Sequence, residues 1–134
     1  MIGIVIVTHG LLAQEILKTA EFIIGSLEGC ATVSIDGSKG PEATRQDISG
    51  AIESVSKGAG VLVLTDMFGG TPSNISLSFL EEGRVEVLTG VNLPMLIKAV
   101  QVRDKAALAE AAQTIGDYAR KSITVAGEIL GGRG

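Results

Sequence analysis

The sequence alternates short apolar runs with segments whose apolar residues recur at helical spacing, and this alternation repeats four times. The apolar runs are residues 1–7, 31–35, 61–65 and 85–89. Segments with helical periodicity follow the first three runs over 12–24, 41–58 and 72–80. A fourth such segment follows the last run and ends near Val102. Strands that alternate with helices predict a parallel sheet with helices on both faces.

The remainder of the chain adds little to this plan. A further helix is predicted around 108–115, and a last short strand over 122–126. We therefore expect an α/β fold with an open, mainly parallel sheet of four strands and helices on both faces, plus a C-terminal strand. The chain of 134 residues fits one domain. That domain is predicted over 1–130, with a flexible glycine-rich tail at 131–134.

Composition excludes several classes of function. Hydrophobic residues make up 46% of the chain and aromatic residues only 3%, so the core must be aliphatic. The net charge is −4 and basic residues are scattered, which argues against nucleic-acid binding. The apolar N-terminus is too short for a membrane span and lacks the basic flank of a signal peptide. A cytoplasmic protein is the simplest interpretation.

The single histidine of the chain, His9, follows the first apolar run, and Asp66 follows the third. Ligands in open α/β sheets gather at the carboxyl ends of strands, where the strand order reverses. A neutral imidazole keeps a free lone pair on one nitrogen, which suits reversible phosphoryl acceptance near neutral pH. A carboxylate that accepts a hydrogen bond from the other ring nitrogen fixes the tautomer of the imidazole. We predict that His9 and Asp66 form an active site.

A glycine-rich turn follows Asp66 and includes Gly69, Gly70 and Thr71. Glycines let the backbone approach a bound group, Thr71 is predicted to cap a helix, and Pro72 suits its first turn. Backbone N–H groups and the helix dipole then make an anion site. With Gly10, these residues form the predicted phosphate site. The spacing is not that of a nucleotide-binding P-loop.

Apolar residues occupy the two loops nearest the predicted site. An exposed apolar ring around His9 would suit a transient protein partner. The alternative is that these side chains fold inward and pack. The predicted docking residues are Met67, Phe68, Leu93 and Met95.

Three motifs together, residues 4–10, 66–74 and 90–95, closely resemble the enzyme IIA component of the mannose family of the bacterial phosphoenolpyruvate-dependent sugar phosphotransferase system. In that family the histidine takes a phosphoryl group from the phosphocarrier protein HPr and passes it to a histidine of a IIB component. By position, the resemblance implies that His9 is the acceptor and Asp66 its orienting partner. It also implies that the Thr71 hydroxyl contacts the phosphoryl oxygens.

The resemblance implies assembly as well. The family is a homodimer in which a C-terminal strand crosses to the other subunit, and residues 122–126 would be that strand here. No metal and no cofactor are implied, and the membrane is reached only indirectly, through a permease. The sugar cannot be identified from this chain.

Five alternative protein classes fit the sequence to different degrees. A two-component receiver domain needs an acidic pair after the first strand, where this chain has Thr8 and His9. Histidine phosphatases and tetrapyrrole chelatases usually use a second histidine. The phosphotransferase subunit of dihydroxyacetone kinase lacks the Gly-Gly-Thr-Pro-Ser-Asn pattern of residues 69–74. A regulatory sensor of phosphorylation state would use the same site as a carrier and stays open.

Overall fold

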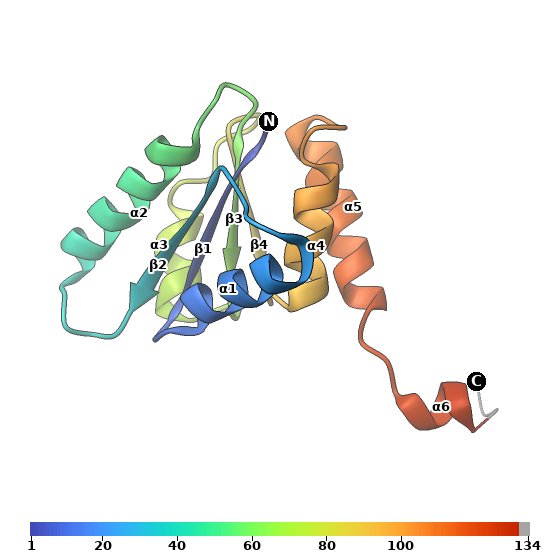
Figure 1. Ribbon diagram of the computed structural model, residues 1–134. Helices are drawn as coiled ribbons and strands as arrows, with labels where there is room; N and C mark the ends of the chain where they lie inside the picture. Colours follow the sequence, from blue (N-terminus) through green and yellow to red (C-terminus); the bar gives the residue numbers. More distant parts are fainter. Residues whose placement is uncertain (132–134) are drawn as a thin grey trace.

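Four parallel strands form one open sheet in the computed structural model, which describes residues 1–131 (Figure 1). The strands are β1 (Gly3–His9), β2 (Cys30–Ile35), β3 (Val61–Thr65) and β4 (Val85–Thr89). Their order across the sheet is β2-β1-β3-β4. The predicted α/β architecture is therefore confirmed, with 61–65 as a central strand and 31–35 at an edge.

Helices cover both faces of the sheet (Figure 1). One face carries α2 (Pro41–Val55) and α3 (Thr71–Leu77). The other face carries α1 (Leu12–Ile24), α4 (Leu93–Val102) and α5 (Leu108–Lys121). This arrangement follows from the right-handed crossover that joins successive parallel strands.

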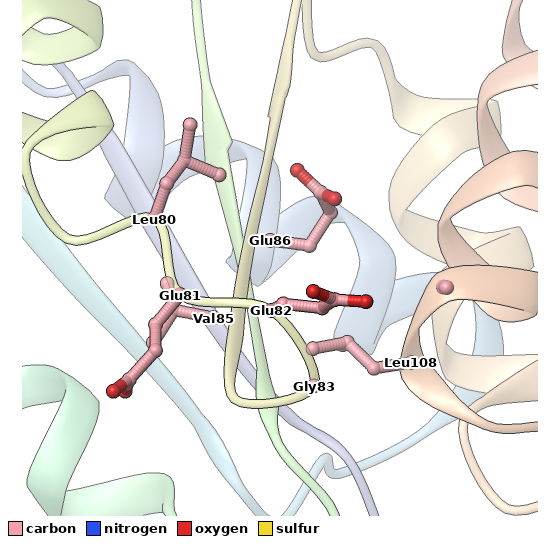
Figure 2. Close-up of a pocket in the computed structure, with 8 residues that line it drawn as sticks. Leu80, Glu81, Glu82, Gly83, Val85, Glu86 and Leu108 are labelled. Carbon is pink, nitrogen blue, oxygen red and sulfur yellow. The ribbon is translucent and has the colours of Figure 1, made fainter.

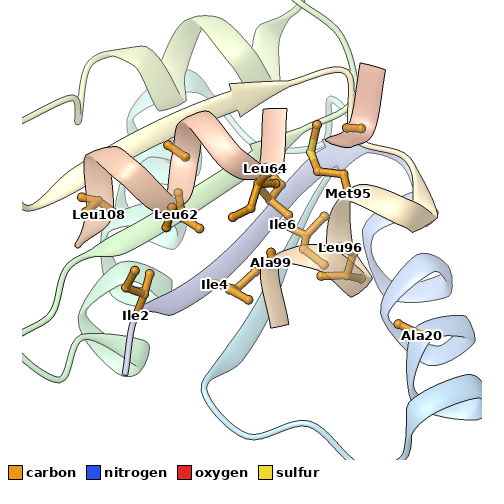
Figure 3. Close-up of a cluster of buried hydrophobic side chains, with 14 of the residues drawn as sticks. Ile2, Ile4, Ile6, Ala20, Leu62, Leu64, Met95, Leu96, Ala99 and Leu108 are labelled. Carbon is orange, nitrogen blue, oxygen red and sulfur yellow. The ribbon is translucent and has the colours of Figure 1, made fainter. Parts of the chain in front are cut away.

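Alternate residues of the central strands feed two separate cores. Ile4 and Ile6 of β1 join Leu62 and Leu64 of β3 under α4 and α5, in the larger cluster (Figure 3). The intervening valines of the same strands face α2 and α3. Because successive side chains of a strand point to opposite faces, a strand covered on both sides must be apolar throughout. The core is aliphatic, as predicted.

The strand order reverses between β1 and β3. From β1 the chain moves to β2 on one side, whereas β3 and β4 lie on the other side. The β1–β3 pairing ends with Val7 opposite Thr65. His9 and Asp66 therefore leave neighbouring strands side by side, at the switch point where open α/β sheets bind their ligands.

The predicted strand over 122–126 is not formed within the single chain. In the described part of the chain, residues 123–125 pair with no strand, and Ala126–Leu130 form the short helix α6. A strand needs a neighbouring backbone for its hydrogen bonds, and α6 instead projects away from the sheet (Figure 1). Of the predicted tail at 131–134, residues 132–134 lie outside the described residues.

No helix within residues 1–131 is both long enough and apolar enough to cross a bilayer.

Candidate functional site

His9 is the last residue of β1, and its backbone is held on the side of β2 by the turn that follows. The Gly10 N–H donates to the Ile35 carbonyl at 2.8 Å, with a φ of +54° that favours glycine. One residue before His9, the buried Thr8 hydroxyl accepts a hydrogen bond from the Ala13 N–H at 2.8 Å. This bond ties the first turn of α1 to the end of β1, so the exit of the chain from the strand is fixed.

The Asp66 carboxylate holds His9 from the side of β3. One oxygen, Oδ2, accepts the backbone N–H of His9 at 2.9 Å and lies 2.8 Å from the ring nitrogen Nδ1. The other oxygen, Oδ1, accepts the Met67 N–H at 3.0 Å. The side chain of Asp66 is 13% exposed, whereas that of His9 is 51% exposed. The predicted pair is therefore in contact, with a largely buried carboxylate and an accessible ring.

The ionisation of Asp66 decides which ring nitrogen carries the proton. Burial of the carboxyl acts to raise the pKa of Asp66, but the hydrogen bonds donated by His9 and Met67 outweigh it, and the pKa lies below its usual value. An ionised carboxylate only accepts hydrogen bonds, so Nδ1 is the protonated nitrogen. When the ring is neutral, this assignment leaves a lone pair on Nε2.

Gly70 approaches the imidazole more closely than any side chain would permit. A Cβ built on Gly70 would lie 2.9 Å from His9 Cε1 and 3.5 Å from Nε2. Gly70 has an ordinary extended φ of −86°, so its backbone conformation does not require glycine. The missing side chain is needed to make room for the ring.

The start of α3 differs from the prediction by one residue. Gly70 is the N-cap and Thr71 is the first helical residue, with no side-chain capping bond. The predicted capping role of Thr71 is therefore wrong, because a residue inside the helix cannot cap it from outside. Gly69 has a φ of +91°, a left-handed conformation that suits glycine.

A cavity of about 480 Å³ lies beside His9, between the loop after β2 and the start of α3. Thr71 lines it together with His9. Asp36 and Lys39 also line it, although neither was predicted from the sequence. The signal was available, because both follow β2 at its carboxyl end, the same edge of the sheet.

The predicted docking residues do not form one surface. Met67 is 56% exposed and Phe68 is 72% exposed. Met95 is only 3% exposed and belongs to the larger core, so the prediction that it contacts a partner is wrong. Leu93 is half-buried and packs against the same core. Leu93 and Met95 pack inward because α4 already begins at Leu93. Asn92 is the N-cap of this helix, and its Oδ1 accepts the Met95 N–H at 2.8 Å.

A second pocket lies at the opposite end of the strands and has a different character (Figure 2). It contains Glu81, Glu82 and Glu86, close to the first residues of β4. The carboxylates do not converge, because Glu81 points away from the other two in Figure 2. Among the described residues, no group of three or more histidine, cysteine or acidic side chains could hold a metal ion.

Fold and site together define an open α/β protein with an accessible histidine at the switch point of its sheet. The family model of PTS system fructose IIA components, named EIIA-man, matches residues 3–116. The chain belongs to this family of IIA components of the sugar phosphotransferase system.

Individual relatives agree with this assignment. The mannose-specific EIIAB component of Escherichia coli K12 is 35% identical over 104 residues, which are 77% of this chain and 32% of the relative. The chain thus spans about a third of that relative. The fructose-specific EIIA component of Bacillus subtilis is 28% identical over 97% of this chain and 90% of its own length.

Solved structures of IIA proteins share the fold over nearly the whole chain. The phosphotransferase system component EIIA from Streptococcus agalactiae superposes with a TM-score of 0.84 and 28% identity, covering 93% of this chain and 97% of that structure. The mannose/sorbose-specific IIA subunit from Enterococcus faecalis gives a TM-score of 0.82 and 26% identity, covering 92% and 93%.

We predict that Gly70→Ala displaces the His9 ring without unfolding the protein. The added methyl group would overlap Cε1, so the ring must rotate and weaken its contact with Asp66. Gly40→Ala is the matched control, because Gly40 is also an extended N-cap of a helix with a proline in its first turn, and a Cβ added there would meet no atom within 4 Å. Nitrogen-15 shifts of the imidazole should change in the first variant only. Unaltered shifts in Gly70→Ala would contradict the close approach.

Proposed function

We propose that this chain is a phosphoryl carrier of the sugar phosphotransferase system, with the Nε2 atom of His9 as the acceptor. HPr would supply the phosphoryl group, and a histidine of a IIB component would receive it. Membership of the IIA family supports the reaction class. The observation that carries the proposal is the 2.8 Å contact between His9 Nδ1 and Asp66, which leaves Nε2 as the nitrogen with a free lone pair.

The transfer balances without a metal ion or a further reactant. The Nε2 lone pair attacks the phosphorus of phosphohistidine on HPr and forms a new N–P bond. The donor N–P bond breaks, and its electron pair returns to the donor imidazole. His9 then carries the phosphoryl group on Nε2 and keeps its proton on Nδ1, so the ring is cationic. Asp66 stabilises that positive charge, and transfer to IIB restores the neutral ring.

Gly10, Gly69, Gly70 and Thr71 remain the proposed phosphate-binding residues. The close approach of Gly70 to the Cε1–Nε2 edge of the ring supports this role, because backbone near Nε2 would also lie near its phosphoryl group. Thr71 lines the same cavity as His9, which supports a hydroxyl contact.

We predict that His9→Ala abolishes phosphorylation and that Asp66→Asn keeps the fold but slows transfer by about 100-fold, because an amide can hold the wrong tautomer. The measurement is the intact mass over time with phosphoenolpyruvate, enzyme I and HPr. Phosphorylation of His9→Ala would refute the acceptor. Wild-type rates in Asp66→Asn would refute the orienting role alone.

A regulatory sensor would accept the phosphoryl group and not pass it on. Adding a candidate IIB protein to the phosphorylated chain separates the two functions. Loss of the phosphoryl group to IIB supports the carrier. Retention of the group with every candidate IIB supports the sensor and contradicts the second transfer step.

Docking of the partner is proposed to use Met67 and Phe68, which are exposed in the turn that follows Asp66. We predict that Phe68→Asp slows phosphorylation by HPr about tenfold, a typical cost of losing an aromatic interface residue. Phe22→Asp is the matched control, because Phe22 is 91% exposed but lies near the far end of α1. Stopped-flow rates at varied HPr concentration measure the effect. Equal rates for the two variants would exclude Phe68 from the interface.

We also propose a homodimer in which residues 122–126 cross to the partner subunit. Two features support it. The edge of β4 away from β3 pairs with no other described strand. Ile123 and Val125, in the segment between α5 and α6, are 77% and 61% exposed, and the backbone of Val125 is extended. A free strand edge and an exposed segment that pairs with no described strand complement each other, and their pairing would cover both.

The mass in solution tests this assembly. We expect a dimer for the wild-type chain and a monomer for the double variant Ile123→Asp, Val125→Asp, because two charges would enter the interface. Thr124→Asp is the matched control, since alternate residues of an extended strand face opposite sides. Sedimentation equilibrium distinguishes these species. A monomeric wild-type chain at working concentration would contradict the proposal.

A further inference from the structure

One cavity is lined both by the proposed phosphoryl acceptor, His9, and by a cation. Ile35, Pro41 and Ile75 give it apolar walls. His9 lines the cavity, and its Nδ1 is engaged with Asp66, which does not line the cavity. Among the described residues of the lining, Lys39 alone carries a positive charge.

Lys39 already forms an ion pair, with Asp47, but this pair is exposed to solvent and can be exchanged. Its Nζ donates a hydrogen bond to Asp47 Oδ2 at 2.7 Å. This bond and the negative charge of Asp47 raise the pKa of Lys39, so its amine stays protonated. The two side chains are 58% and 42% exposed, and ion pairs this open to solvent are weak.

The same cavity also holds a negative charge that would oppose a phosphoryl group. Asp36 lines it, and hydrogen bonds from Ser38 keep the pKa of Asp36 below its usual value. A phosphoryl dianion on His9 would face this carboxylate across the cavity. Without a cation between them, the charges would repel each other. The positive charge of Lys39, in the lining of the same cavity, would reduce the repulsion between the phosphoryl group and the Asp36 carboxylate.

We propose that Lys39 binds the phosphoryl group of the phosphorylated state, and that its ammonium group exchanges Asp47 for the phosphoryl oxygens carried on His9. This inference rests on the proposed function, because it assigns a contact within the same site. A dianion attracts the ammonium group more strongly than a single carboxylate does. The flexible four-carbon stem of lysine lets its ammonium group change partners.

The test measures the charge of the phosphoryl group itself. Phosphoramidate phosphorylates histidine without any protein donor, so His9 can be loaded independently of HPr. Phosphorus-31 NMR then follows the last deprotonation of the phosphoryl group with pH. We expect Lys39→Gln to raise that pKa by about half a unit, because a nearby cation favours the dianion. Asp47→Asn should lower it, because Lys39 is then released.

Lys57→Gln is the matched control, since it removes one exposed lysine charge just beyond the far end of α2. Its phosphoryl titration should match that of the wild-type chain. A Lys39→Gln titration equal to wild type would overturn the proposal. If phosphoramidate loads His9 but HPr does not, the carrier function fails while the Lys39 measurement stands. A His9 that takes phosphoryl from neither source would contradict both.

Discussion

One carboxylate oxygen joins the two central strands at the point where their backbone pairing ends. The β1–β3 ladder stops at Val7 and Thr65, and Asp66 Oδ2 then accepts the His9 N–H that a longer β3 would have bonded through its backbone. The same oxygen contacts the imidazole. Closure of the ladder and orientation of the ring therefore depend on a single group. Because strand geometry fixes the backbone of His9, the carboxylate also fixes the direction of its side chain.

The rest of the site follows from this constraint. With Nδ1 turned toward β3, the Cε1–Nε2 edge of the ring lies close to the turn before α3. Only a residue without a side chain fits there, and Gly70 occupies that position. The ring is thus hydrogen-bonded to Asp66 at Nδ1, and the backbone of Gly70 confines it near Cε1. Its remaining surface is open to solvent and to the cavity that Lys39 lines.

Much of this could be predicted from the sequence, because it depends on local pattern and on one topological rule. Apolar runs identified β1 to β4, and the rule for carboxyl ends of strands placed His9 beside Asp66. Errors arose where a single residue of register mattered. Thr71 was predicted as a cap but lies within α3, and Met95 was placed in a loop although Asn92 already caps α4 before it.

Other features were beyond any local pattern. Residues 122–126 have the composition of a strand, but a strand exists only where another backbone pairs with it, and the single chain supplies none among its described residues. The sequence places Lys39 after β2, at the same edge of the sheet as His9, but the cavity that both residues line depends on how β2 and α3 lie in space.

The balance between firm and weak contacts suits a reversible carrier. A carrier must release its phosphoryl group about as easily as it accepts it, so tight binding of that group would slow the second transfer. In the proposed site the firm contacts act on the ring, through the largely buried Asp66 and through Gly70. The proposed contact from Lys39 is exposed and screened by solvent, so it stabilises the phosphoryl group only modestly. The contacts of Asp66 and Gly70 would then fix the direction of Nε2, whereas the phosphoryl group would be bound weakly enough to leave.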